Sequence, residues 1–365
     1  MGAGTAQGGA CLLISGKVRK NMEFVVFAGV LLLLFIFMIV QELIQTKNQE
    51  KLFKKYLREN YGKEPPKEYS LERFARLGSY LERHKEEKQL DDITWNDLGM
   101  DEVFRRIDRT YSAAGEEYLY YTLRNISCGR EALEHLEEVV NWLQEQENIK
   151  VRIQLLMKRL GHLGKYSLYD YLDNVDYLGE RSNRKIVLGN LLYLPFLLLL
   201  FVQPAMGTIG IVLCMLWHIM TYFREKKVIE PYIISFAYVL RLIDVCEELE
   251  KQKIPVYRRE LDELREALKS LRELRRGAYW VMAGNQGKIG GNPLDILADY
   301  LRMILHLDIF QFNRMLEKLR KKTGQVENML AITGYLDMAI SVGGFRKSLE
   351  GYCIPKLEED TEKAF

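Results

Sequence analysis

Apolar residues are spread unevenly along this chain, and its two longest apolar runs carry no charge. Residues 24–40 (FVVFAGVLLLLFIFMIV) contain no polar side chain, and residues 186–223 contain no Asp, Glu, Lys or Arg. A helix needs about 20 mostly apolar residues to cross a bilayer. The first run therefore predicts a transmembrane helix at residues 22–42. The second run is too long for one span and predicts a transmembrane hairpin at residues 186–223.

The middle of the second run contains residues that favour a turn. Residues 203–208 (QPAMGT) include Pro and Gly, which divides the run into two spans at roughly 186–202 and 208–223. Two alternatives stay open. The basic stretch 17–20 before the first run is also typical of a cleaved signal peptide. A helical hairpin buried in a soluble core would be apolar as well.

Basic residues flank the hairpin on both sides, whereas its turn has no charge. The flanking residues are Arg181, Arg184 and Lys185 before it, and Arg224, Lys226 and Lys227 after it. The positive-inside rule places both flanks in the cytoplasm. We therefore expect a multi-pass membrane protein of three spans, with its N-terminus outside and nearly all of its soluble mass in the cytoplasm.

Outside these runs, apolar residues recur at steps of three and four between charged residues. This period is typical of amphipathic α-helices, and alternation with period two is nearly absent. The sequence predicts an all-α fold of long antiparallel helices that pair side by side. The apolar stripes are Leu133, Leu136, Val140 and Leu143; Ile229, Ile233, Phe236, Leu240 and Ile243; Leu261, Leu264, Leu268 and Leu271; Leu294, Leu297, Leu301 and Ile304; and Met329, Thr333, Leu336 and Ile340.

Local signals mark where these helices begin and end. Pro255 interrupts one pattern, and residues 321–324 (KKTG) read as the basic last turn of a helix followed by a C-terminal glycine. Residues 292–293 (NP) read as an N-cap followed by proline. The glycine-rich stretch 284–292 separates a long helical region from a final pair of helices. At the N-terminus, residues 1–21 predict a flexible Gly/Ala tail.

Overall composition narrows the classes of function. The chain of 365 residues has 52 Lys and Arg against 50 Asp and Glu. This balance lacks the excess of positive charge that is typical of a nucleic-acid-binding domain. Its five cysteines lie far apart without a C-x-x-C pair, which favours a reduced protein over a disulfide scaffold.

Motifs for catalysis or cofactor binding are missing from the sequence. The stretch 284–292 (GNQGKIGGN) departs from a phosphate-binding P-loop, which needs four residues between its glycines and a hydroxyl after the lysine. The five histidines have no spacing typical of zinc ligands. We therefore expect no enzymatic activity, no cofactor and no metal in this chain by itself.

Two basic clusters are candidates for contacts to a DNA backbone, although glutamates interleaved with the first favour a solvated helix face there. They lie in residues 272–276 (RELRR) and 318–322 (KLRKK). The candidate cations are Arg272, Arg275, Arg276, Lys318, Arg320, Lys321 and Lys322.

Small residues open a predicted helix at residues 112–115 (SAAG), directly before several large ones. Small side chains at such a place allow a second backbone to approach closely. A simple turn between two helices is the alternative.

Two segments resemble the MutS family of DNA mismatch-repair proteins. Residues 91–127 contain DLGMD, an apolar helix pattern and the step TYSAAG, followed by Tyr118, Leu119, Leu123 and Arg124; this order is similar to the core segment of that family. Residues 334–341 (GYLDMAIS) with Phe345-Arg346 are similar to its G-x-L-D-x-x-x-S helix and the following Y-R step.

The resemblance implies a domain organisation. Residues 43–90 would be charged juxtamembrane helices, 91–180 a MutS-like core, 228–355 a MutS-like lever region, and 356–365 a tail where the ATPase domain of the family would begin. A packing motif of the core helix against the lever helix would then consist of Ser112, Ala113, Gly115, Gly334 and Asp337.

The resemblance also implies a function. The chain would be a membrane-anchored core and lever module, non-catalytic by itself, that couples an ATPase half or a partner to the bilayer. ATP and magnesium would act only if an ATPase domain were supplied elsewhere. A homodimer or an ATPase-domain partner is expected, and DNA binding is the weakest expectation. The alternative is a membrane-tethered helical scaffold for a protein partner without a nucleic-acid role.

Overall fold

The computed structural model describes residues 36–41, 43–63, 69, 71–85, 88–126, 129–163, 167–173, 178–179, 181–275 and 300–354. Over these residues the chain is all-α, with one isolated bridge between Gln89 and Asn125 and no strand. The predicted all-α class is therefore confirmed. The chain forms two compact units, Met1–Asn60 and Tyr61–Phe365.

In the first unit, residues 36–41 and 43–60 are helical. Most of the predicted span 22–42 lies outside the described residues, as do the tails 1–21 and 356–365, the loop 284–292 and the predicted helix start at 292–293.

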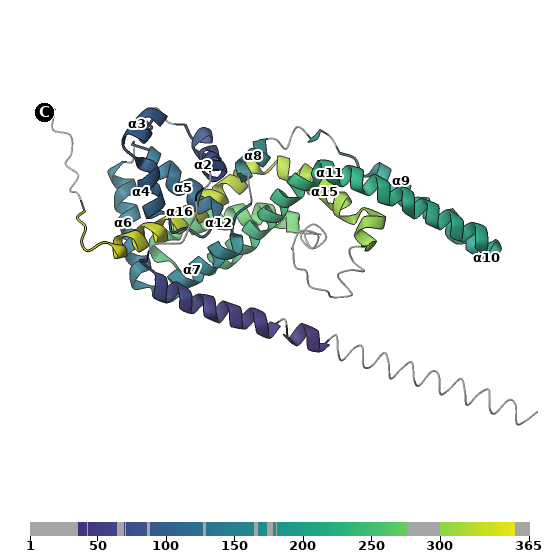
Figure 1. Ribbon diagram of the computed structural model, residues 1–365, viewed down its shortest axis with the longest axis horizontal. Helices are drawn as coiled ribbons and strands as arrows, with labels where there is room; N and C mark the ends of the chain where they lie inside the picture. Colours follow the sequence, from purple (N-terminus) through teal and green to yellow (C-terminus); the bar gives the residue numbers. More distant parts are fainter. Residues whose placement is uncertain are drawn as a thin grey trace, which may run out of the picture. The chain divides into compact units, whose positions relative to one another are not determined.

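The core of the second unit is built around the long helix α16 (Thr323–Ser348). The helices that pack against it include α5 (Ala113–Arg124), α6 (Arg130–Glu145), α7 (Glu147–Leu160) and α12 (Arg258–Leu271). Figure 1 shows α16 among these helices. The predicted stripe from Met329 to Ile340 is buried here, since α16 is covered on several sides.

A smaller apolar cluster lies on the other side of α5. It joins α2 (Leu71–Arg83), α3 (Asp92–Asp97) and α4 (Met100–Ile107) around the buried rings of Trp95 and Phe104 and the side chain of Leu77. α5 thus has two packed faces, one toward α16 and one toward α2.

The predicted hairpin forms from α9 (Arg184–Leu191), α10 (Tyr193–Val202) and α11 (Pro204–Glu250). The expected turn at 203–208 is wrong in extent, because only Gln203 separates α10 from α11. Pro204 occupies the first turn of α11, where proline needs no N–H partner. A second difference is that α11 is one helix of 47 residues, which joins the predicted span to the predicted helix at 229–243.

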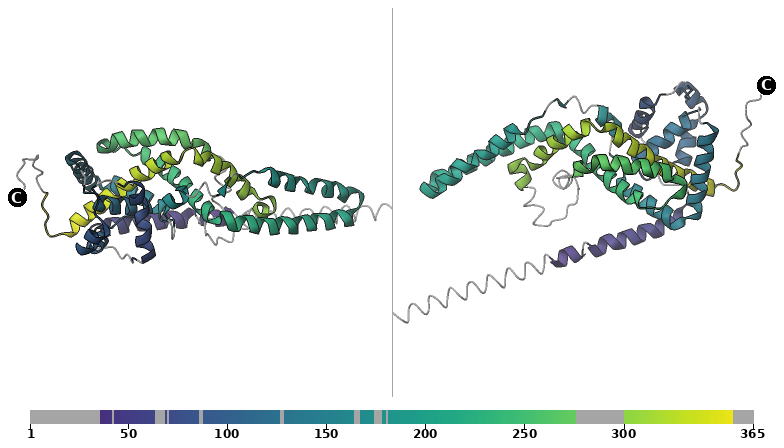
Figure 2. Two further views of the ribbon diagram at one scale, coloured as in Figure 1. Left: turned by 90° about the horizontal axis from the view of Figure 1, so that it is seen from above. Right: turned by 180° about the vertical axis from the view of Figure 1, so that it is seen from behind.

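Two glycines of α11 allow α10 to approach it. A Cβ atom on Gly207 would lie 2.6 Å from the Leu200 backbone nitrogen, and a Cβ on Gly210 would lie 2.1 Å from the Phe196 ring. Small residues permit such contact between apolar helices. Figure 2 shows α10 alongside the first half of α11 in two further directions.

Two helical stretches of the described chain have the length and composition to cross a membrane, Arg184–Val202 and Pro204–Glu230. In the most apolar part of each, 6% and 28% of the residues are buried. The apolar side chains of the hairpin are therefore mostly uncovered within this chain, including those of Leu198, Phe201 and Met220.

The remaining boundaries follow the sequence signals in part. The interruption at Pro255 is confirmed, because α11 ends at Glu250 and the short 3₁₀ turn Pro255–Tyr257 precedes α12. α15 (Leu307–Arg320) ends in basic residues as predicted. Gly324, however, lies inside the first turn of α16, because the break between the helices falls at Lys322 (φ −137°, ψ 21°) and no left-handed glycine is needed.

Candidate functional site: the α5–α16 junction

The start of α5 is capped by the residue before it. Ser112 has extended backbone (φ −126°, ψ 154°), and its hydroxyl accepts a hydrogen bond from the Gly115 N–H at 3.1 Å. Serine is a favoured N-cap for this reason. The helix therefore begins at Ala113, and its first N–H groups point toward whatever lies before them.

A carboxylate from α16 occupies that position. Asp337 is fully buried, and its Oδ2 accepts hydrogen bonds from the Tyr111 N–H (3.0 Å), the Ser112 N–H (2.8 Å) and the Ser112 hydroxyl (2.6 Å). A helix N-terminus carries partial positive charge, so an anion there is stabilised. One side chain of α16 thereby fixes the residues that begin α5.

Glycine on each helix makes this contact possible. A Cβ on Gly115 would lie 2.4 Å from Asp337 Oδ2, and a Cβ on Gly334 would lie 2.6 Å from the Ala114 carbonyl oxygen. Both distances are shorter than any real contact, so the two backbones meet where side chains are missing.

A second polar residue repeats the contact one helical turn along α16. The hydroxyl of Ser341 accepts from the Arg109 N–H and donates to the Ile107 carbonyl, both at 2.7 Å. Residues four apart share one face of a helix. Asp337 and Ser341 together therefore hold the segment 107–112 that leads into α5; we call this set of contacts the α5–α16 junction.

The structure thus brings Ser112, Gly115, Gly334 and Asp337 together. Ala113, the fifth residue of the predicted packing motif, is buried nearby, but its N–H donates to the Gly161 carbonyl at 3.0 Å. Ala113 consequently ties α5 to the end of α7, while the other four residues tie it to α16.

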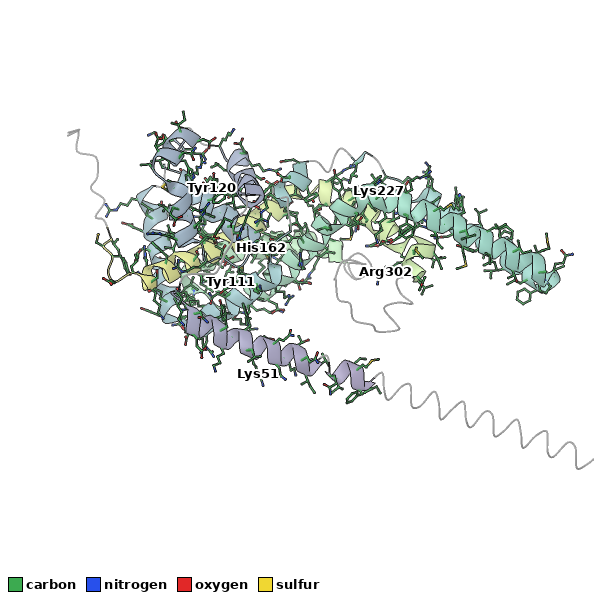
Figure 3. All side chains as sticks on the ribbon, in the orientation of Figure 1. Lys51, Tyr111, Tyr120, His162, Lys227 and Arg302 are labelled. Atoms are coloured by element: carbon green, nitrogen blue, oxygen red, sulfur yellow. The ribbon has the colours of Figure 1, made fainter. Side chains whose placement is uncertain are left out.

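The opposite face of α5 carries a buried ion cluster that the sequence reading missed. The carboxylate of Glu116 is fully buried and accepts hydrogen bonds from Arg73 and from Arg76, the latter at 2.7 Å; His162 Nε2 lies 3.1 Å from it. Both arginines belong to α2. Because the side chain of a buried carboxylate needs such partners, α2 is fixed to α5. Tyr111 and His162 are labelled in Figure 3.

Glu117, the next residue, is buried in less polar surroundings. It accepts a hydrogen bond from the Ser167 hydroxyl at 2.8 Å. Burial raises the pKa of Glu117 to about 8, although this hydrogen bond and the charge of Arg76 lower it. The only signal in the sequence was the pair of glutamates in a helix otherwise made of small and aromatic residues.

The polar side chains around the α5–α16 junction hold helices in position. The buried carboxylates of this region accept hydrogen bonds from backbone, hydroxyl and arginine groups, which hold the helices in place. In the described part of the chain, no group of three His, Cys, Asp or Glu side chains is placed to hold a metal ion.

The two basic clusters lie near one another, away from the junction. Arg272 is exposed in the short 3₁₀ helix Arg272–Arg275, and α15 contacts this helix. Lys322 donates to the Ser270 carbonyl and Arg320 to the Gly179 carbonyl at 2.9 Å.

Two of the seven candidate DNA contacts therefore hold neighbouring backbone. Of the other cluster members, Lys318 is half-buried and Lys321 is exposed. Only the backbone of Arg275 is described, and Arg276 lies outside the described residues.

Comparison of the chain with protein-family models, with curated proteins and with solved structures gives no match. Functional inference accordingly depends on the junction, on the hairpin and on the motif residues quoted above.

Proposed function

We propose that this chain is a membrane-anchored, non-catalytic helical module, similar to the core and lever of MutS family proteins, that couples a partner to the bilayer. The observation that carries the proposal is the α5–α16 junction. The two segments that resemble the family bind each other through the residues of the resembling motifs, namely Gly334, Asp337 and Ser341 on α16 and Ser112 and Gly115 before and within α5.

A lever needs a stiff rod and a firm attachment. α16 has 26 residues, which is roughly 39 Å at about 1.5 Å per residue. Its attachment to α5 resists sliding, because displacement would leave the buried Asp337 carboxylate without its donors, which costs several kcal/mol at the order-of-magnitude level. Motion applied to one end of α16 would therefore be carried to α5 and to the helices packed on it.

The proposal includes three membrane spans, residues 22–42 and the two helices of the hairpin, with the soluble mass in the cytoplasm. A core helix of a soluble protein is mostly buried, whereas only 6% of the most apolar part of Arg184–Val202 is buried. A bilayer is the simplest cover for such a surface. ATP and magnesium enter only with an ATPase partner, and a homodimer is the other assembly that fits a lever module.

The topology is tested by cysteine labelling of the full chain in intact cells. In a Cys11→Ser background, native Cys353, which is exposed, is expected to react with a membrane-impermeant maleimide only after lysis. Cysteine placed at exposed Gln203, between α10 and α11, is expected to react before lysis. Labelling of Cys353 in intact cells would contradict the proposed orientation.

The lever itself is tested by hydrogen exchange of the purified chain in detergent. Asp337→Ala is expected to speed amide exchange in residues 109–124 as well as around position 337 in α16. Asn328→Ala, at an exposed position of α16, is the matched control and should leave α5 unchanged. If Asp337→Ala altered exchange in α16 alone, the two helices would not move together.

The second candidate is a membrane-tethered helical scaffold for a protein partner, without a nucleic-acid role, and the uncovered apolar residues of the hairpin support its anchoring equally. Both candidates keep the chain with the membranes in alkaline carbonate. The hydrogen-exchange test separates them, because a scaffold does not require Asp337→Ala to change exchange in α5 and α16 together.

A further inference from the structure

A cavity of about 810 Å³ lies where α9, α11 and α15 meet at the base of the hairpin. Its volume is in the range of small-molecule sites. Lys227, labelled in Figure 3, marks this level of α11. One end of the cavity is polar and includes Arg181, Lys185 and Arg224; the other end is apolar and includes Leu192 and Trp217.

The polar end has an excess of positive charge. Three cations and one carboxylate, Glu225, line it. Arg181 pairs with Glu225 and also donates to Asn313 Oδ1 at 3.1 Å. Lys185 and Arg224 are exposed at the rim and form no ion pair with any residue that the structure describes. Two positive charges therefore line the cavity without an ion-pair partner among the described residues.

Two histidines form the inner wall. The rings of His218 and His306 lie 5.4 Å apart, and both side chains are buried. Thr221 Oγ1 lies 3.3 Å from His306 Nε2, while His306 Nδ1 is buried without a well-formed hydrogen bond in the described part of the chain. Burial lowers the pKa of His306 to about 4, with His218 as a second cause. A neutral imidazole thus remains for a ligand to satisfy.

The apolar end continues into a groove along the hairpin. Leu192 and Trp217 also line a second hollow of about 460 Å³, whose other walls include Phe196, Leu199 and Leu213. The cationic site and this groove therefore share two residues and form a path from a charged end to an apolar end.

We propose that the cavity binds the phosphate-bearing headgroup of an anionic phospholipid, with one acyl chain lying in the groove. Lys185 and Arg224 would bind the phosphate, which prefers such cations. The inference rests on the membrane anchoring proposed above, because the two candidate spans, Arg184–Val202 and Pro204–Glu230, begin and end near this level. Basic pockets beside membrane helices are suited to anionic headgroups, and an indole at the apolar end fits the interface. A water-soluble phosphate ester would use the cations but not the groove.

The test uses the full chain in vesicles and the fluorescence of Trp217, which bromine on an acyl chain quenches at short range. Trp217→Phe identifies the part of the signal that comes from this residue among the four tryptophans of the chain. Brominated phosphatidylglycerol is expected to quench it at a lower mole fraction than brominated phosphatidylcholine.

Lys185→Gln with Arg224→Gln should remove this preference. Surface attraction alone contributes about fivefold per cation, or about 25-fold for any pair, so the loss in this variant should exceed the loss in the control pair. Arg184→Gln with Lys227→Gln is the matched control, since both residues are exposed on the same two helices and do not line the cavity.

Each other outcome overturns the proposal. Equal quenching by the two lipids would mean that the cavity does not select an anionic headgroup. Equal losses in the two double variants would indicate surface attraction alone. Displacement of the lipid by equimolar glycerol phosphate would assign the site to a soluble ester. Failure of anchoring itself is seen separately, because the wild-type chain would then leave the vesicles in alkaline carbonate.

Discussion

Replacing Gly115 by alanine tests the closest approach in the α5–α16 junction. Alanine normally stabilises a helix interior by up to about 1 kcal/mol relative to glycine. At this position the new methyl group would lie 2.4 Å from Asp337 Oδ2 and 2.7 Å from its Cβ and Cγ atoms. The carboxylate must therefore move away, and with it the acceptor for both Ser112 groups.

The expected loss follows from these two effects. Overpacking of a tight site costs about 1–3 kcal/mol, and weakening hydrogen bonds to a buried charged acceptor costs about 1.5–3 kcal/mol. After the helix propensity of alanine is subtracted, the net destabilisation is about 3 kcal/mol. For a chain of this size, each kcal/mol lowers the melting temperature by about 2 °C, so we expect a fall of about 6 °C.

The measurement is thermal unfolding of the full chain in one mild detergent, followed by near-ultraviolet circular dichroism. Gly78→Ala is the matched control: Gly78 lies within α2, and an added Cβ there has no atom within 4 Å. It should raise the melting temperature by about 1–2 °C through helix propensity alone. If Gly115→Ala were as stable as the wild type while Gly78→Ala behaved as stated, the close contact with Asp337 would be refuted.

Three further predictions concern separate parts of the second unit. Ser112→Ala and Asp337→Asn are each expected to cost about 1–3 kcal/mol, and the double variant less than their sum because they share a hydrogen bond; additive melting shifts would contradict the direct contact. The folded chain keeps the proton of Glu117 up to about pH 8, whereas the unfolded chain loses it above pH 4.5. Stability should therefore fall between these values as pH rises, on the order of 1 kcal/mol per pH unit, and a melting series from pH 5.5 to 8.5 should be flatter in Glu117→Gln. Gly210→Val, against the Phe196 ring, should separate α10 from α11 and slow migration of the detergent-bound chain on gels, whereas Thr208→Val should not.

The helical content was predictable because it depends on local pattern. Apolar residues at steps of three and four mark the buried face of a helix. Pro255 interrupts the helical pattern because proline has no N–H to donate to a helical hydrogen bond. Gln203 and Pro204 were recognisable as a break. The length of this break was not predictable, because proline is as common in the first turn of a helix as in a loop.

The continuity of α11 was not predictable from hydropathy. Polarity changes near Phe223, and Glu230-Pro231 offers a place to end, yet the helix runs through to Glu250. A change in what surrounds a helix does not itself break the backbone, and a single proline removes only one hydrogen bond from an otherwise supported helix.

Only separate parts of the α5–α16 junction could be predicted from the sequence. Small residues at 112–115 and the spacing between Asp337 and Ser341 are visible in the sequence, but Ser112 and Asp337 are 225 positions apart. No local sequence pattern indicates that Ser112 and Asp337 are in contact. The buried ion cluster of Glu116 was missed for the same reason, since its partners Arg73 and Arg76 resemble any exposed arginines of an amphipathic helix.

The continuity of α11 and the rigidity of the junction have a common mechanical consequence. The first half of α11 belongs to the hairpin, while buried residues of its second half, from Ile229 to Leu249, pack among α7, α12 and α16. No loop separates these halves. A hinge between hairpin and helical body would therefore require bending an intact helix, so a displacement of the hairpin is passed directly to the helices around α16. Asp337 and Ser341 fix the entry to α5 on α16. The path from the hairpin to α5 therefore runs through packed helices and buried hydrogen bonds, which is the property that a coupling module requires.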